Sequence, residues 1–357
     1  MGNKKTLTLA KSQKNDEFYT QIDDIQNEMN SYFEYNQDVF RDKIILLPCD
    51  DPTWSNFTLF FINNFKKFGI KKIISTSYFP KHKAKQQLSL FNNCAINEIK
   101  PNGKISVIDR NTITNDFFEL KNIQWEYLQG DGDFNSDEVR KFRDEADIII
   151  TNPPFSQFRK FISWVMEANK QFAIIGHQNA ITYKEVFPLI KENKIWLGNG
   201  FKGNCTYFIS DYFDYATAGN HIEGMIRVSG VTWFTNIKCK RCDKTLNLKN
   251  TSDVFKYSKH KNVKGNKCFL HYEDYDAIDI PFTDCIPNDY YGLMGVPITF
   301  MNKYNPNQFE IIGCCEPCIS LQNIKNTSFY KEIPSRQKIY NGMLCQKTYH
   351  RILIRQK

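Results

Sequence analysis

The sequence has no long apolar run and no secretory leader, and both absences limit where the protein can act. No stretch of roughly 18 apolar residues is present to cross a bilayer, and the opening Met-Gly-Asn-Lys-Lys is not followed by an apolar signal-peptide core. The 11 cysteines are an odd number scattered along 357 residues, which favours reduced thiols over a disulfide framework. The sequence therefore predicts a cytoplasmic protein that makes no membrane contact.

Two common ligand signatures are also missing. There is no Gly-x-Gly-x-x-Gly, so the usual dinucleotide fingerprint is absent, and the six histidines lack metal-ligand spacing. Cys239-x-x-Cys242 and Cys315-x-x-Cys318 do have zinc-ligand spacing, but 72 residues separate Cys242 from Cys315, far more than a compact zinc ribbon uses. We therefore expect no metal, with a non-catalytic, zinc-stabilised nucleic-acid-binding module as an alternative interpretation.

Acidic residues are scarce in three segments of the chain. The net charge of the whole chain is nevertheless only +8. Residues 1–14, 238–267 and 325–357 together hold 22 of the 47 basic residues and 3 of the 39 acidic ones. The rest has 25 basic against 36 acidic residues. A mildly acidic body with basic additions favours binding to a polyanion, while solvated lysine-rich loops are the simpler explanation for any one segment.

Short apolar runs alternate with helical patterns through the first two thirds of the chain. Helical spacing is found after residue 15 and in segments that begin near residues 55, 156 and 183. Strands are expected at 43–48, 71–75, 125–128, 146–150, 171–176 and 195–197, with further candidates at 205–209 and 231–236. This alternation predicts a doubly wound α/β sheet. After residue 236 the sequence becomes basic and irregular, and 349–354 is the last recognisable strand.

The most informative stretch is Thr-Asn-Pro-Pro-Phe at 151–155, between the buried strand 146–150 and the helical pattern 156–168. Open α/β sheets place ligands at such strand ends. The two prolines hold the chain extended and remove two N–H donors. The Asn152 side-chain oxygen and the Pro153 carbonyl could therefore accept both hydrogens of a planar NH₂-bearing group, with Phe155 stacked on its ring. The bland alternative is a rigid turn before a helix.

Three other predicted strands also end in polar residues. Cys49-Asp50-Asp51-Pro52 leads to Ser55-Asn56-Phe57 at a helix start, where carboxylates suit an amine-bearing ligand and backbone amides suit its carboxylate. Gly130-Asp131-Gly132-Asp133-Phe134 could hold an adenine NH₂ and ring, or be a plain turn. After the second strand stand Ser75, Thr76 and Ser77, where an acid often holds a ribose, so the ribose contact stays open.

The ordered set of these motifs resembles the EcoRI-type family of adenine-specific DNA methyltransferases, from about residue 15 to the C-terminus. The set begins with Asn15-Asp16-Glu17-Phe18-Tyr19-Thr20 and also includes Trp233-Phe234-Thr235-Asn236 and Gly295-Val296-Pro297-Ile298-Thr299-Phe300. The sequence departs from the wider methyltransferase pattern in lacking the Gly-x-Gly loop and the second-strand acid.

The resemblance implies a Rossmann-like class I methyltransferase sheet of about seven strands, the last antiparallel, with S-adenosylmethionine across the strand ends. It assigns the catalytic role to Asn152, Pro153, Pro154 and Phe155. It assigns cofactor binding to Phe18, Tyr19, Thr20, Asp50, Asp51, Pro52, Ser55, Asn56, Asp133 and Phe134, with Asp131 as the alternative acid. The domains would be a basic arm at 1–14, a catalytic domain at 15–237, and a DNA target-recognition region at 238–357 whose terminal strands pack back.

The expected activity is sequence-specific methylation of adenine N6 in double-stranded DNA, after the base is flipped out of the duplex. The candidate DNA-binding residues are Lys81, Lys83, Arg241, Lys256, Lys259 and Lys261. The enzyme would work as a monomer in restriction-modification, with a cognate endonuclease encoded nearby, or as an orphan methylase. Amino-methyltransferases of RNA or of protein glutamine also use Asn-Pro-Pro motifs, and they remain the alternative.

Overall fold

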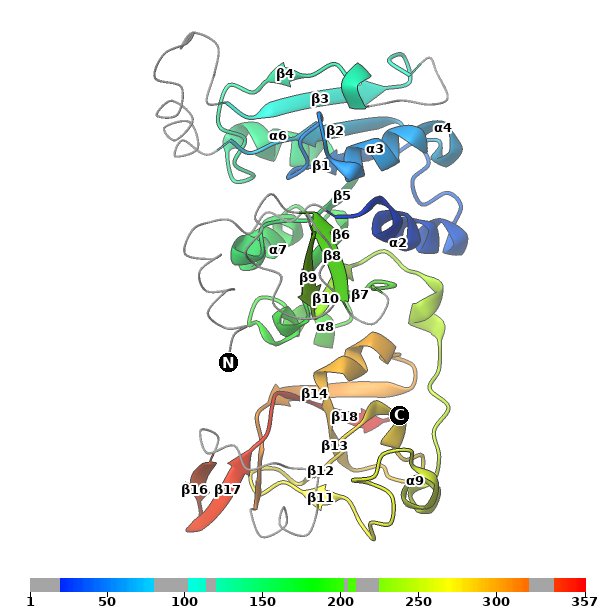
Figure 1. Ribbon diagram of the computed structural model, residues 1–357, viewed down its shortest axis with the longest axis vertical. Helices are drawn as coiled ribbons and strands as arrows, with labels where there is room; N and C mark the ends of the chain where they lie inside the picture. The colour runs from blue at the N-terminus through cyan, green and yellow to red at the C-terminus, as the bar shows by residue number, and fades with distance from the viewer. Residues whose placement is uncertain (1–19, 80–101, 114–119, 202–204, 210–224, 321–336) are drawn as a thin grey trace. The chain divides into compact units, whose positions relative to one another are not determined.

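The computed structural model describes residues 20–79, 102–113, 120–201, 205–209, 225–320 and 337–357 (Figure 1). The chain forms two compact units: unit 1 comprises Met1–His177 and Ile195–Lys240, and unit 2 comprises Gln178–Lys194 and Arg241–Lys357. Segment 178–194 lies in unit 2, where Lys191 donates a hydrogen bond to the Ile312 carbonyl (2.9 Å). The functional domain boundary at residue 237 stays a prediction.

Unit 1 is built on an eight-stranded sheet in the order β4-β3-β2-β1-β5-β6-β10-β7. The strands are β1 Ile44–Leu47, β2 Lys72–Thr76, β3 Lys104–Asp109, β4 Glu126–Tyr127, β5 Ile148–Thr151, β6 Gln171–His177, β7 Trp196–Leu197 and β10 Val231–Thr235. Neighbours among β2, β1, β5 and β6 are parallel, whereas β10 is antiparallel to both β6 and β7. The expected count of about seven strands was too low, because β3 pairs antiparallel with both β2 and β4 and separates them.

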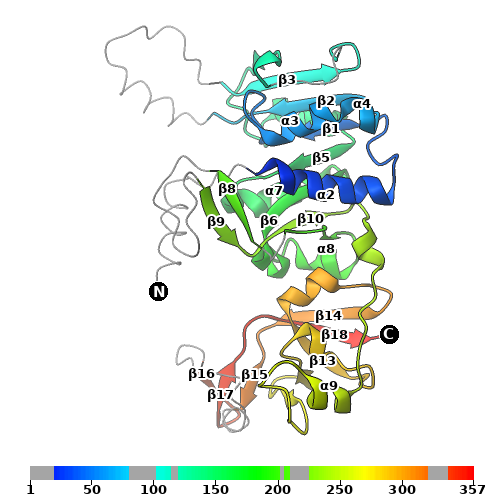
Figure 2. The same ribbon diagram turned by 45° about the vertical axis from the view of Figure 1, so that its right-hand side comes forward.

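Helices cover both faces of this sheet, which explains why β1 and β5 consist of continuously buried residues. Adjacent residues of a strand point to opposite faces. On β10, Trp233 contacts Phe57 of α3 (Asn56–Asn63), and its neighbour Phe234 contacts Phe158 of α7 (Phe158–Glu167). Figure 2 shows α2, α3 and α4 together on one side. The helices of unit 1 are α2 Ile22–Tyr35, α3 Asn56–Asn63, α4 Phe65–Phe68, α6 Asp137–Glu145 and α7 Phe158–Glu167, with short 3₁₀ turns η1 Leu120–Asn122 and η2 Phe155–Gln157.

A buried carboxylate fixes α2 to the loop after β7. Glu28 is fully buried and accepts hydrogen bonds from the Tyr32 hydroxyl (2.5 Å) and from the backbone amides of Asn199 (2.7 Å) and Gly200 (2.9 Å). Burial, followed by the charge of Glu28, raises the pKa of Tyr32. A Cβ on Gly198 would lie 2.0 Å from a Glu28 oxygen, so only glycine fits there. Three donors on one buried carboxylate offset much of its desolvation.

The candidate strand at 205–209 does not join the large sheet. It forms β8 (Cys205–Ile209), which pairs antiparallel with β9 (Met225–Ser229) in a separate hairpin. Phe208 of this hairpin is fully buried and contacts the ring of Phe155 edge-on, with 6.4 Å between centroids. The hairpin therefore lies beside the Asn-Pro-Pro-Phe loop.

Unit 2 is richer in strands than its irregular sequence suggested. Five strands form one sheet in the order β11-β12-β13-β18-β14, and three form a second in the order β15-β17-β16. The strands are β11 Leu270–His271, β12 Ala277–Asp279, β13 Leu293–Pro297, β14 Phe309–Cys315, β15 Cys318–Ser320, β16 Gln337–Tyr340, β17 Met343–Lys347 and β18 Arg351–Gln356. The helical elements are η3 Gln178–Thr182, α8 Phe187–Lys191, η6 Lys240–Asp243, which starts in unit 1, α9 Thr251–Tyr257, η7 Thr283–Cys285 and η8 Ile298–Lys303.

The terminal strand lies inside the unit 2 sheet. β18 pairs with β13 on one side and β14 on the other, so it is a central strand of this sheet. Arg351, at its start, donates to the buried Asp279 carboxylate (2.9 Å), which also accepts from the Tyr272 hydroxyl. Among the helices that the structure describes, none is long and apolar enough to cross a membrane.

Candidate active site

The carboxyl ends of β1, β2 and β5 meet at one edge of the unit 1 sheet. The backbone amide of Asp50 donates to the Thr76 carbonyl (2.9 Å), and the Thr76 hydroxyl donates to the Pro48 carbonyl (3.1 Å). Since β5 is parallel to β1 and directly beside it, the Asn-Pro-Pro-Phe loop after β5 emerges at this same edge. The structure thus brings together three of the stretches that the sequence marked as polar strand ends.

Asp50 connects the loop after β1 to the strand that precedes Asn152. One carboxylate oxygen accepts from the Ser55 hydroxyl and the other from the Thr151 hydroxyl, both at 2.7 Å. Ser55 in turn caps α3 by accepting from the amides of Phe57 and Thr58. Burial raises the pKa of Asp50 to about 7, against the hydrogen bonds from Thr151 and Ser55, which lower it. The carboxylate is 5% exposed, so its contacts are with the protein's own hydroxyls.

Asp51 is held by a lysine that sequence reasoning missed. Its carboxylate accepts from the Thr53 amide (2.8 Å) and forms an ion pair with Lys104 (3.1 Å). The Lys104 ammonium also lies 4.9 Å from the ring centroid of Trp125. Lys104 was missed because β3 was missed, although the β-branched run Ile-Ser-Val-Ile at 105–108 could have signalled that strand.

The Asn-Pro-Pro-Phe loop is tied to the N-terminal motif. The Asn152 amide nitrogen donates to the Thr20 hydroxyl (3.2 Å), and the Asn56 amide nitrogen donates to the Thr20 carbonyl (2.8 Å). Thr20 is 3% exposed, and Pro153 is buried, while Asn152 and Phe155 are partly exposed. The Asn152 side chain therefore lies at the strand end with its nitrogen bonded to Thr20 and its oxygen buried.

The loop 130–134 packs backbone against backbone on the end of β2. The Phe79 amide donates to the Asp131 carbonyl (2.8 Å), and a Cβ on Gly132 (φ +80°) would lie 2.0 Å from the Ser77 carbonyl oxygen. The carboxylates of Asp131 and Asp133 accept from backbone amides two residues on, at 3.2 and 2.8 Å. Both acids are partly exposed, and their role in binding adenine stays a prediction.

The ring of Phe134 packs against the helix α7. It is 8% exposed and packs against Phe161 and Trp164 of α7, with centroid distances of 5.0 and 5.6 Å. The Phe134 side chain thus anchors the 130–134 loop to the helix that follows Asn-Pro-Pro-Phe, and its contact with adenine stays a prediction.

Most of the candidate DNA-binding residues of unit 2 are exposed, but three of them already have partners, including Lys256, whose ammonium lies 5.0 Å from the ring centroid of Tyr257. Lys256, Lys259 and Lys261 are exposed, and Lys259 forms an ion pair with Asp284 (3.0 Å). Arg241 is partly buried and donates to the Met301 carbonyl (3.3 Å). Lys256 and Lys261 therefore suit phosphate contacts better than Lys259, and a base-reading Arg241 would have to leave its carbonyl.

The predicted cysteine pairs do not gather into a zinc site within the described residues. The one group of three possible ligands there consists of His260, Asp284 and Cys285. His260 contacts the Asp284 carboxylate at 2.9 Å and stacks on Phe282. Partial burial opposes ionisation of Asp284, yet hydrogen bonds from Lys259 and His260 prevail and lower its pKa. These contacts explain the cluster as a structural link between the basic segment that contains His260 and residues 282–284.

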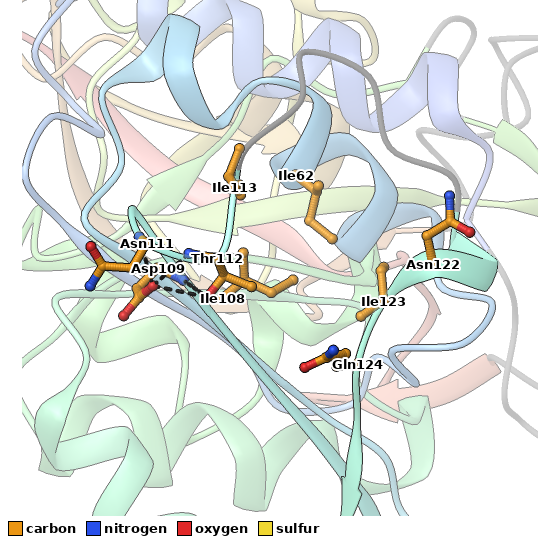
Figure 3. A pocket seen from close by; sticks show the side chains of 9 residues that line it. All are labelled: Ile62, Ile108, Asp109, Asn111, Thr112, Ile113, Asn122, Ile123 and Gln124. Atoms are coloured by element: carbon orange, nitrogen blue, oxygen red, sulfur yellow. Dashed lines mark hydrogen bonds between the residues drawn. The ribbon is translucent and has the colours of Figure 1, made fainter.

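A cavity of about 470 Å³ lies away from the strand ends just described (Figure 3). It is lined by Ile62 of α3, by Ile108 and Asp109 of β3, and by residues 111–113 and 122–124. Asp109 pairs with Lys72, at the amino end of β2, so the cavity is at the opposite edge of the sheet. Asp109 accepts three hydrogen bonds, from the Asn111 amide and from the amide and hydroxyl of Thr112.

Four predicted site residues lie outside the described residues. They are Phe18 and Tyr19 of the N-terminal motif and the basic residues Lys81 and Lys83. Their assignments stay predictions. Pro52 is buried directly after the two acids of the first-strand motif.

The sequence is similar to curated proteins along almost its whole length. It is 37% identical to the Type II methyltransferase M.EcoRI of Escherichia coli, over 99% of this chain and 97% of that protein. It is 33% identical to M.MgeORF184P of Mycoplasma genitalium, over 98% of both chains, and 30% identical to M.MpnI of Mycoplasma pneumoniae, over 98% and 97%. No solved structure matches. Residues 6–357 match the family described as "Adenine-specific methyltransferase EcoRI", and the chain therefore belongs to this family of adenine-specific methyltransferases.

Proposed function

We propose that this protein transfers a methyl group from S-adenosylmethionine to N6 of an adenine in a specific sequence of duplex DNA, with Asn152 as the principal catalytic residue. The observation that carries the proposal is the position of Asn152, at the carboxyl end of the buried strand β5, with its amide nitrogen bonded to Thr20. Asn152 and Pro153 then offer two carbonyl oxygens and no competing N–H from the prolines.

The sheet supports the assignment to a class I methyltransferase fold. If β3 is set aside as an insertion, the other seven strands, numbered along the chain, follow the order 3-2-1-4-5-7-6. The seventh, β10, is antiparallel and lies between the fifth and sixth. A parallel sheet with one antiparallel final strand is what the family resemblance implies.

The residues at the strand ends suit S-adenosylmethionine. Asp133, or Asp131 beside it, would accept a hydrogen bond from the adenine NH₂ of the cofactor. The loops around Asp50 and Thr20 would lie beside its methionine part. The close approach of Gly132 to Ser77 leaves no space for a side chain, so the ligand would meet backbone there. When bound, the cofactor supplies an electrophilic methyl group on a positively charged sulfur.

Residues of this chain increase the reactivity of the exocyclic adenine nitrogen by their position around it. The lone pair of the exocyclic NH₂ is delocalised into the ring, and acceptors placed on both hydrogens favour pyramidalisation and return electron density to nitrogen. Asn152 and Pro153 are those acceptors, and Phe155 contacts the ring of the target base. Such positioning and electrostatic effects account for most of the catalysis. Flipping the base costs a few kcal/mol, which basic contacts to the flanking phosphates offset.

DNA is the substrate that the relatives favour, since all three carry the name Type II methyltransferase. No observation on this chain favours RNA or a protein glutamine. A separate restriction endonuclease of the same specificity and action as a monomer stay predictions.

The decisive experiment is Asn152→Ala, assayed by transfer of labelled methyl groups to unmethylated genomic DNA. We expect a loss of at least a hundredfold in rate with cofactor affinity within about threefold, because the lost acceptor acts mainly as the nitrogen attacks. Asn111→Ala, an exposed asparagine at the opposite edge of the sheet, is the matched control. Parent-like turnover by Asn152→Ala would refute the assignment of the active site.

A further inference from the structure

We infer that Asn102 and Glu138 are positioning residues that hold the loop 130–134 where its acids meet the adenine of the cofactor. The inference deepens the proposed function and rests on it, since Asp131 and Asp133 are the acids that would accept from the adenine NH₂. It starts from four hydrogen bonds that converge on two consecutive peptide groups just before Asp131.

Segment 128–130 needs such partners because it follows the end of a strand. β4 ends at Tyr127, so its regular pairing with β3 stops there. Backbone amides and carbonyls that lose a partner in the sheet must find another partner or bind water. Backbone groups serve the two ends of the segment, since the Leu128 amide donates to the Gly103 carbonyl (2.8 Å) and the Gly130 carbonyl accepts from the Gly103 amide (2.9 Å).

Two side chains bind the four backbone groups between these ends. The Asn102 amide nitrogen donates to the carbonyls of Leu128 (2.7 Å) and Gln129 (3.2 Å). The Glu138 carboxylate accepts from the amides of Gln129 (3.0 Å) and Gly130 (3.1 Å), with a different oxygen for each. Each of the two peptide groups therefore has its carbonyl bound by Asn102 and its N–H bound by Glu138.

The backbone fixes the polarity of all four contacts. A peptide carbonyl only accepts and a peptide N–H only donates, so Asn102 must present its nitrogen and Glu138 its oxygens. The two side chains come from separate elements, since Asn102 lies just before β3 and Glu138 lies in the first turn of α6. They thus attach the same short segment both to a strand and to a helix.

The position of this segment determines where the acids lie. Asp131 follows Gly130 directly, and its carboxylate accepts from the Asp133 amide (3.2 Å). The Asp133 carboxylate accepts from the Asn135 amide (2.8 Å). Because both carboxylates are bound to the backbone of their own loop, they move with that backbone. A loop released at residues 128–130 would sample other positions, and the cofactor would have to order it on binding.

The test compares two ligands by calorimetry without DNA. One is S-adenosylhomocysteine, the product left after methyl transfer, and the other is its analogue with hydrogen in place of the purine NH₂. The parent should prefer S-adenosylhomocysteine by at least about tenfold, because only its NH₂ can donate to an acid of the loop. Glu138→Ala and Asn102→Ala should each weaken S-adenosylhomocysteine binding by roughly threefold to tenfold, the scale of one hydrogen bond, and binding of the analogue by less than about twofold.

Two variants of nearly unchanged shape separate the polarity of the contacts from the bulk of the side chains. Asn102→Asp places an oxygen against two carbonyl oxygens, so it should weaken S-adenosylhomocysteine binding at least as much as Asn102→Ala. Glu138→Gln keeps one acceptor, so its effect should be smaller than that of Glu138→Ala, and it provides the comparison if the alanine variant does not fold. Asp137→Ala is the matched control and should leave both affinities unchanged, because Asp137 is an exposed acid in the same helical turn.

Equal weakening of both ligands in Glu138→Ala and Asn102→Ala would refute the inference, because a general loss of structure does not distinguish the two ligands. Parent-like affinities in these variants would also refute it, as would a parent with no preference for the ligand that carries the NH₂. A parent that binds neither S-adenosylhomocysteine nor S-adenosylmethionine would instead refute the proposed function.

Discussion

Replacing Asp50 by asparagine should remove a loss of stability that unit 1 undergoes as the pH rises. Burial raises the pKa of Asp50 from 3.8 to about 7. At pH values between these two, Asp50 keeps its proton in the folded protein and has released it in the unfolded chain. Since the folded state binds more protons between these values, the stability that this group contributes is fully present below about pH 4. It is lost as the pH rises through about 7. Asparagine has the same shape, does not titrate, and can still accept from one hydroxyl and donate to the other.

The magnitude follows from the size of the pKa shift. A group with a folded pKa of about 7 and an unfolded pKa near 3.8 loses about 2.7 kcal/mol of unfolding free energy between pH 5 and pH 8. The Asp50→Asn variant should therefore gain about that much relative to the parent over the same interval. A gain between about 1.5 and 4 kcal/mol agrees with the structure.

Urea unfolding followed by tryptophan fluorescence is a suitable assay, because all five tryptophans of the chain lie in unit 1. Unfolding free energies of the parent and of Asp50→Asn would be compared at pH 5, 6, 7 and 8. Asp38→Asn, which removes the same formal charge from an exposed position, controls for the change in net charge. A difference between Asp50→Asn and the parent that stays constant with pH, or that grows in favour of the parent, would refute the argument for a buried, proton-holding Asp50.

Two further predictions concern the ligands. Asp133→Ala should weaken S-adenosylmethionine binding by at least about tenfold in calorimetry, since a hydrogen bond to a charged group contributes about 1.5–3 kcal/mol; the same loss in Asp131→Ala alone would move the adenine contact to that acid. Changing four exposed lysines of unit 2 to glutamine should flatten the salt dependence of DNA affinity by up to about 0.9 in the log–log slope per phosphate contact, and an unchanged slope would exclude this segment. These lysines are Lys256, Lys261, Lys264 and Lys267, and the matched control is the same change at Lys66, Lys67, Lys71 and Lys121.

The strands that the sequence predicted best are those whose residues are buried on both faces. Ile-Ile-Leu-Leu at 44–47 and Ile-Ile-Ile-Thr at 148–151 are continuous apolar runs that suit the middle of a parallel sheet and little else. β3 was missed because it lies nearer the sheet edge, where Val107 is exposed and Ser106 is buried, so its pattern does not follow hydrophobicity. The two sheets of unit 2 were missed for a similar reason, since several of their strands have only two or three residues.

The motif positions could be predicted, but the partners of their side chains could not. Asp50 binds Thr151, 101 residues away, and Asn152 binds Thr20, 132 residues away. No local pattern encodes such pairs, because they depend on which strands become neighbours. The sequence therefore indicated ligand roles for Asp50 and Phe134, but it did not indicate the two hydroxyls that bind Asp50 or the two aromatic rings that pack against Phe134.

If Asn152 is the catalytic residue, there is a physical reason why Asp50 and Thr20 contact the protein's own side chains. The acceptors offered to the target base are neutral, and a neutral acceptor stabilises a developing positive charge on nitrogen less strongly than a carboxylate does. The accurate position of the two acceptors must then provide the stabilisation that a negative charge would otherwise give. This requires a loop that is already held in place by its own hydrogen bonds. The contacts of Asp50 with Thr151 and of Thr20 with Asn152 hold the residues on that loop from two sides. The acid of the first strand would thus contribute to catalysis through the geometry of Asn152.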